Sequence, residues 1–147
     1  MTLRLALIIS ITLLSASSFA DSNHYAQERE VYQQAIQSIQ VNNHDIYQQS
    51  RRLLKDYPLL PYLDYEHIVS SFSELPVKRV SLFLKKNEET YIGRRMRYTW
   101  LNYLGSKQEW SLFKQFYNDD YTSDTNLCYD IRADLELANS KEETSLA

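Results

Sequence analysis

Apolar residues recur every three to four positions along almost the whole chain after residue 20, and this spacing is typical of amphipathic α-helices. Polar or proline-containing turns of a few residues separate the apolar segments. The segments lie within residues 25–39, 46–54, 62–72, 77–84, 92–103, 110–117 and 127–138. We therefore expect an all-α fold of about seven helices.

The turn between the second and third segments carries two prolines, within the sequence LKDYPLLPYLDY of Leu54 to Tyr65. Pro58 fixes its own φ and biases the preceding residue toward extended geometry, so a helix that begins near Asp45 is expected to end there. Pro61 suits the first position of a new helix, where its missing N–H costs nothing. The sequence thus predicts a helix, a turn and a second helix.

The other breaks are equally short. Asn42 and Asn43 interrupt the first helical pattern, and Gly105 is expected to follow the fifth helix as its C′ residue. Short connections favour antiparallel neighbours, and stacked hairpins of this kind form an α-solenoid, that is, a segment of a superhelix. Because no period of about 34 residues is visible, we expect irregular helical hairpins and not tetratricopeptide repeats.

The first twenty residues have the features of an export signal. Arg4 supplies a positive charge, residues 5–14 form an apolar run, and Ser18 and Ala20 place small residues where signal peptidase accepts them. We expect cleavage after Ala20. A membrane anchor is the alternative, but a span needs about 20 apolar residues, and so we expect no membrane span in the mature chain.

Composition narrows the classes of function. Without Arg4 the mature chain carries 15 basic and 19 acidic side chains, and a duplex-binding protein is usually basic, so we expect no nucleic-acid partner. Only two glycines occur, which excludes phosphate-cradling loops and argues against a turn-rich β-fold.

No pattern of catalytic or metal-binding residues stands out. The three histidines do not form an HExxH pair, so we expect no metal site and no cofactor, and we interpret them as ordinary, partly exposed side chains. Glu66, Glu74 and Glu136 lie in polar surroundings that keep a carboxylate ionised, so none is a candidate general acid. The sequence assigns no catalytic residue.

The twelve tyrosines raise the alternative of a carbohydrate-binding surface. Most aromatic residues recur at helical intervals with aliphatic ones, which indicates packing between helices. Three fall outside these stripes and are the better candidates for glycan contact: Tyr91, Tyr98 and Tyr121. Arg94 and Arg95, in a basic cluster with Arg97, Lys85 and Lys86, are candidates for binding peptide carboxylates, although such clusters are more often solvated.

The segment LKDYPLLPYLDY resembles the N-terminal region of the soluble lytic murein transglycosylases, whose pattern is LKDYPL-x-PYL-x-Y. The resemblance continues through residues scattered over the second half of the chain: Arg97, Trp100, Leu101, Leu104, Lys107, Trp110, Cys128 and Ala133. It implies a periplasmic location and a helical superhelix, of which residues 21–147 are the N-terminal part, truncated before the catalytic domain.

The same resemblance implies a substrate. These enzymes cleave the MurNAc–GlcNAc bond of peptidoglycan to a 1,6-anhydro product, using a glutamate of an E-S-x-W-like motif and a G-L-M-Q-like segment in a lysozyme-like C-terminal domain. Neither motif occurs here, so the resemblance transfers no catalytic residue. We expect this chain alone to be inactive and to depend on the missing C-terminal portion. A stand-alone periplasmic binding or adaptor module is the competing interpretation.

Cys128 is the only cysteine in a chain that we expect to be exported. An odd cysteine in an oxidising compartment indicates either a partner thiol or a free one. The family resemblance implies a disulfide to a following helical hairpin beyond residue 147. The residues alone equally allow a buried free thiol beside Leu127 and Ile131.

Overall fold

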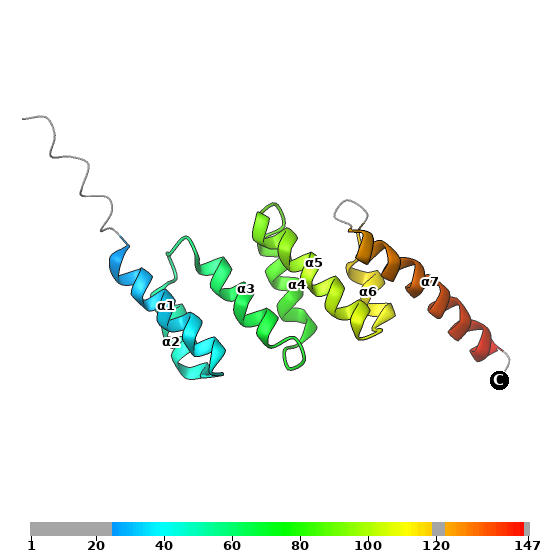
Figure 1. Cartoon of the computed structure of the whole chain (residues 1–147), viewed down its shortest axis with the longest axis horizontal. Coiled ribbons are helices and arrows are strands. Elements are labelled where there is room, and N and C mark those ends of the chain that lie inside the picture. The colour runs from blue at the N-terminus through cyan, green and yellow to red at the C-terminus, as the bar shows by residue number, and fades with distance from the viewer. Residues whose placement is uncertain (1–24, 119–122, 146–147) are drawn as a thin grey trace, which may run out of the picture. The chain divides into compact units, whose positions relative to one another are not determined.

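A computed structural model describes residues 25–118 and 123–145 of the chain. These residues form seven α-helices and no strand (Figure 1), which confirms the expected all-α fold. The chain divides into two compact units between Tyr57 and Pro58. None of the described helices is long and apolar enough to cross a membrane.

The first unit is a hairpin of α1 (Ala26–Gln40) and α2 (His44–Leu53). Its turn forms at the predicted asparagines: Asn42 adopts a left-handed φ of 53°, which asparagine tolerates better than most residues. The Asn43 side chain accepts a hydrogen bond from the Ile46 amide at 3.2 Å and so caps α2. Asparagines therefore both end α1 and start α2.

The proline segment separates two helices, as predicted, but the bounds differ from those expected. Helix α2 already ends at Leu53, well before Pro58, and α3 (Leu60–Ser70) starts at Leu60, so Pro61 is its second residue. Tyr57, which precedes Pro58, is buried against the rings of the first unit, with centroids 5.4 Å from Tyr25 and 5.8 Å from Tyr32.

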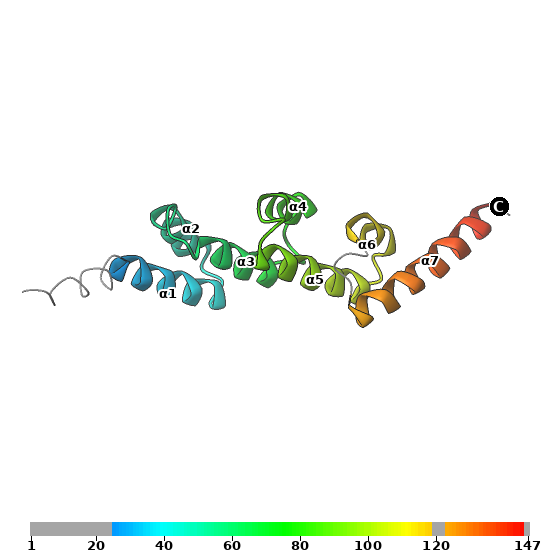
Figure 2. The ribbon, with the colours of Figure 1, turned by 90° about the horizontal axis from the view of Figure 1, so that it is seen from above.

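The second unit is built around α5 (Tyr91–Ser106), which packs against every other helix of that unit. Its neighbours are α3, α4 (Val77–Lys86), α6 (Trp110–Phe116) and α7 (Asp124–Ser145). Figure 2 shows α4 and α6 on one side of the layer formed by α3 and α5. The hairpins of this unit thus stack through α3, α5 and α7, as expected of a solenoid-like segment.

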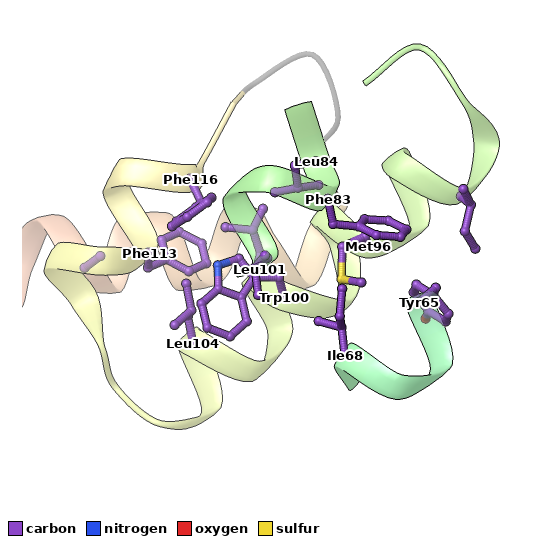
Figure 3. Close-up of a cluster of buried hydrophobic side chains, with 13 residues drawn as sticks. Tyr65, Ile68, Phe83, Leu84, Met96, Trp100, Leu101, Leu104, Phe113 and Phe116 are labelled. Atoms are coloured by element: carbon purple, nitrogen blue, oxygen red, sulfur yellow. The ribbon is translucent and has the colours of Figure 1, made fainter. Parts of the chain in front are cut away.

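Aromatic and aliphatic side chains from all five helices form the core of this unit (Figure 3). Trp100 lies in the core, with its ring centroid 4.9 Å from Phe72, 5.4 Å from Tyr103 and 5.9 Å from Phe116. Offset and edge-to-face contacts of this kind add about 0.5–1.5 kcal/mol per pair beyond the area buried. Most of the helical aromatic stripes therefore do pack between helices, as the periodicity predicts.

The prediction for Gly105 is wrong. Gly105 lies within α5, is buried, and has no positive φ; a Cβ there would approach the Tyr129 ring to 2.3 Å. The C′ residue is Gln108, with φ 60°: its amide donates to the Gly105 carbonyl and the Glu109 amide to the Leu104 carbonyl. This is a Schellman motif. Gly105 instead permits the close approach of α7.

The apolar spacing within residues 127–138 predicts that this side of α7 is buried, and that prediction is wrong. Leu127, Cys128, Ile131 and Leu135 are all exposed. The face that packs against the unit lies on another side of the helix than the predicted one. It carries polar and aromatic residues as well as an apolar one: Asn126, Tyr129, Asp130 and Ala133.

Contacts with α6 explain this rotation. Lys114 forms ion pairs of 2.6 Å with Asp130 and 2.9 Å with Asp134, and the Arg132 guanidinium lies 5.6 Å from the centroid of the Trp110 ring. Pairing between these side chains, together with the Tyr129 ring, orients α7 against α6. Apolar periodicity alone does not reveal such pairs.

Candidate functional site

The described carboxylates do not form a catalytic centre. Glu66, Glu74 and Glu136 are exposed, as their polar surroundings predict. The Asp130 side chain is only 16% exposed, but it is held in the ion pair with Lys114. Lys114 has a raised pKa, first because it donates a hydrogen bond to Asp130 and then because it donates one to Asp134. These groups therefore stabilise the α6–α7 contact.

The histidines do not form a ligand set either. His44 is exposed, whereas His67 is buried in α3, contrary to the expectation of a partly exposed side chain. His24 lies outside the described residues. Within the described ranges, no group of three or more histidine, cysteine, aspartate or glutamate residues is placed to hold a metal ion.

The candidate glycan contacts gather on α5. The side chain of Thr90 accepts a hydrogen bond from the Gly93 amide at 3.1 Å, and so α5 begins at Tyr91. Tyr91, Arg95 and Tyr98 then follow at i, i+4 and i+7 on one helix face. Tyr91 is 59% exposed and Tyr98 is 45% exposed. The third tyrosine candidate, Tyr121, lies outside the described residues.

Arg95 is exposed but firmly positioned. Its Nε donates to the hydroxyl of Tyr65 at 3.2 Å, and its guanidinium lies 5.3 Å from the centroid of the Tyr65 ring. The Thr99 hydroxyl donates to the Arg95 carbonyl at 2.9 Å. Since that hydroxyl has a single hydrogen, the 3.0 Å contact between Tyr65 and Thr99 has Tyr65 as its donor. Arg95, Tyr65 and Thr99 thus form a closed hydrogen-bond loop between α3 and α5.

The electrostatics of Arg95 agree with this geometry. Its pKa is raised above the ordinary value, chiefly by the hydrogen bond to Tyr65 and next by the charge interaction with the same tyrosine. The guanidinium therefore remains charged at any physiological pH. The site is a cation that the Tyr65 hydroxyl holds in place on an exposed helix face.

The remaining basic candidates have separate positions. Arg94 is exposed, and its Nη1 contacts the Glu89 carbonyl at 3.4 Å, in the turn before α5. Lys85 and Lys86 are exposed at the end of α4. Arg97 does not belong to the basic surface, because its Nη1 donates to the Phe116 carbonyl at 3.1 Å, at the end of α6.

Two members of the site escaped the sequence reasoning. Tyr65 reads as a core residue, and it is indeed 5% exposed, but its hydroxyl reaches Arg95. Thr99 is predictable from the sequence as a neighbour of Arg95, since it follows Arg95 by four residues and so lies on the same helix face. The hydrogen bond between Arg95 and Tyr65 joins residues that are 30 positions apart, and no local sequence pattern predicts it.

Cys128 is a free cysteine and is exposed on α7. The interpretation of a buried thiol is therefore wrong, because Leu127 and Ile131, which were expected to cover it, are themselves exposed. A disulfide to a segment beyond residue 147 stays a prediction.

The fold and the site together define an all-α array of helical hairpins with a basic, tyrosine-bearing surface on α5. Comparison with known proteins shows a more particular relationship. The chain is 31% identical over 104 residues to the soluble lytic murein transglycosylase of Escherichia coli K12. It is 29% identical over 101 residues to the enzyme of the same name from Salmonella typhimurium.

These matches cover 71% and 69% of the chain but only 16% of each relative, within the N-terminal part of those enzymes. The chain therefore spans about a sixth of the length of the curated relatives it matches. The resemblance carried by the proline segment is confirmed: this chain is similar to the N-terminal part of the soluble lytic murein transglycosylases. No family model matches the chain, and no solved structure matches it.

Proposed function

We propose that this chain is the N-terminal scaffold portion of a soluble lytic transglycosylase that cleaves peptidoglycan glycan strands during cell-wall turnover. In this proposal the enzyme breaks the MurNAc–GlcNAc bond and leaves a 1,6-anhydro product. The similarity to named murein transglycosylases over 71% of the chain supports the substrate class. The stacked hairpins of the second unit support a structural role.

The absence of a buried carboxylate from the described part of the chain is the observation on which the scaffold role depends. Glycoside cleavage needs a carboxylic acid that is still protonated when it meets the leaving oxygen, and burial in an apolar pocket is the usual way to raise the pKa of such a group. The buried polar residues in the described part of the chain are all uncharged or histidine: Ser38, Ser50, His67, Asn87 and Asn126. The C-terminal portion of the enzyme would supply the catalytic glutamate.

The location follows from the same proposal. Peptidoglycan is outside the cytoplasmic membrane, and the features of residues 1–20 fit a signal peptide that is removed after Ala20. We expect the mature chain in the periplasm. Periplasmic extraction followed by N-terminal sequencing should return Asp21 as the first residue, whereas a chain that keeps Met1 or stays in the membrane fraction would contradict this.

A stand-alone periplasmic binding or adaptor module is the second candidate, and the exposed Tyr91–Arg95–Tyr98 surface favours it. Such a module would hold a glycan strand or a protein without chemistry. The reading frame that follows residue 147 decides between the two. Further helical hairpins and an E-S-x-W segment would support the scaffold, and unrelated sequence would support the module.

The activity test uses purified residues 21–147 and purified sacculi. We expect no release of 1,6-anhydro-muropeptides, measured by mass spectrometry, from sacculi that an active lytic transglycosylase does digest in a parallel reaction. Release of these products by the chain alone would show that the catalytic group is present and that the scaffold assignment is wrong.

A further inference from the structure

The guanidinium of Arg95 is held in place and still open to a ligand. Its Cζ lies 5.3 Å from the centroid of the Tyr65 ring, and its Nε donates a hydrogen bond to the Tyr65 hydroxyl at 3.2 Å. An arginine has five N–H donors, so further donors remain after the hydrogen bond to Tyr65. The side chain is nevertheless exposed. Its terminal nitrogens therefore have a defined orientation and access to solvent.

The hydrogen-bond loop prepares this cation for a planar anion. A free arginine loses rotamer freedom when it binds, but Arg95 has already given up much of it to Tyr65. Guanidinium and carboxylate groups match in geometry and form paired N–H···O bonds.

Two exposed rings flank Arg95 along the helix. Tyr91 precedes it by four residues and Tyr98 follows it by three, which separates the two tyrosines by about 10 Å along the axis. An extended ligand of a few sugar or amino-acid units can touch both rings while its carboxylate meets Arg95. Arg94 adds a second positive charge on the same part of the helix. Glu88 and Glu89 are exposed in the turn before α5, so the anion is favoured toward the Tyr98 side.

We propose that Arg95, held by Tyr65 and flanked by Tyr91 and Tyr98, binds the free carboxylate of a peptidoglycan peptide stem. This inference rests on the proposed function, because that function supplies the substrate class. It goes further by assigning a docking site for the peptide stem to a helix of the scaffold, apart from any catalytic group.

The test titrates residues 21–147 with a soluble disaccharide-tetrapeptide muropeptide in low salt, by isothermal calorimetry or by NMR. Arg95→Gln removes the positive charge and the paired N–H donors of the guanidinium. We expect it to weaken binding by about tenfold to a hundredfold, the range that corresponds to hydrogen bonds between charged groups. The control is Arg52→Gln, which removes the same charge from an exposed position on α2 and should change binding less than about twofold.

Chemical variants of the ligand test the carboxylate directly. The same muropeptide with its carboxylates amidated should bind the unmodified chain as weakly as the free muropeptide binds Arg95→Gln. A neutral chitooligosaccharide should also bind weakly. If the amidated or neutral ligand binds as well as the free acid, contact is by sugar stacking alone and the inference is wrong.

Arg95→Lys separates charge from geometry, because lysine keeps the charge but cannot form the paired bonds. We expect an intermediate affinity, with a circular-dichroism melt close to that of the unmodified chain. Equal affinity for the unmodified chain, Arg95→Gln and Arg95→Lys would overturn the inference, as would the absence of any binding to the muropeptide. Neither result affects the scaffold assignment, because that assignment is tested by the digestion of sacculi.

Discussion

Gly93→Ala tests the packing between α4 and α5. Gly93 lies in the first turn of α5, and a Cβ there would be 1.9 Å from the carbonyl oxygen of Asn87 and 2.7 Å from its carbonyl carbon. That oxygen already accepts hydrogen bonds from the Thr90 amide at 3.0 Å and from the Thr90 hydroxyl at 2.7 Å. Since backbone and not a flexible side chain opposes the new methyl group, the turn itself must move.

The magnitude follows from three contributions. Alanine is favoured over glycine in a helix by about 1 kcal/mol. Overpacking costs about 1–3 kcal/mol, and the loss of one turn hydrogen bond costs about 0.5–1.5 kcal/mol. The steric and hydrogen-bond costs exceed the gain in propensity, so we expect a net destabilisation of about 2 kcal/mol. For a unit of this size that corresponds to a fall in Tm of about 8–16 °C.

The assay is thermal and urea denaturation of residues 21–147, followed by circular dichroism at 222 nm. Ser81→Ala is the matched control, since it also raises helix propensity but lies exposed on α4. We expect its Tm to stay unchanged or rise slightly. If Gly93→Ala is as stable as the unmodified chain, or more stable, the close approach of α5 to the Asn87 carbonyl is wrong.

Three further predictions concern α6 and α7. Asn126 is fully buried and neither side-chain polar atom has a partner in the described structure, so Asn126→Leu should leave Tm unchanged or raise it. The raised pKa of Lys114 beside Asp130 and Asp134 means that its stabilising contribution is complete below the ordinary value of 10.5 and is lost as pH rises through the higher folded value. Lys114→Met should therefore flatten the loss of stability in alkaline urea titrations. Native Cys128, being exposed, should react with Ellman's reagent without denaturant, at about one thiol per chain.

Each of these has a contrary outcome. A fall of several degrees in the Tm of Asn126→Leu would mean that the amide makes bonds that stabilise the native unit. An unaltered alkaline titration in Lys114→Met would mean that solvent screens the ion pairs, a strong effect for a side chain that is 34% exposed. A thiol that reacts only after denaturation would place Cys128 inside the fold.

The helical segments and their breaks were predictable because the determinants are local. Pro58 and Pro61 restrict the backbone conformation of their own and the preceding residues. Asn42 adopts the left-handed φ that the turn between α1 and α2 requires. Such signals need no knowledge of the partner helix.

Rotation of a helix about its own axis was not predictable in the same way. The buried face of α7 depends on Lys114, which lies 16 positions before Asp130, and on the Tyr129 ring seated over Gly105. Tyr65 and Arg95 are a second case, since the sequence predicts a core position for Tyr65 and a solvated charge for Arg95. In both cases the pairing of side chains that are distant in the sequence, and not the periodicity of either helix, determines which residues are in contact.

Treatment of sacculi with purified residues 21–147 decides whether this chain is a scaffold or carries the catalytic group itself. We predict that mass spectrometry of the supernatant finds no 1,6-anhydro-muropeptide. Anhydro products in that supernatant, absent from a buffer blank, would contradict this, because they would require a general acid in a chain whose described part buries no carboxylate.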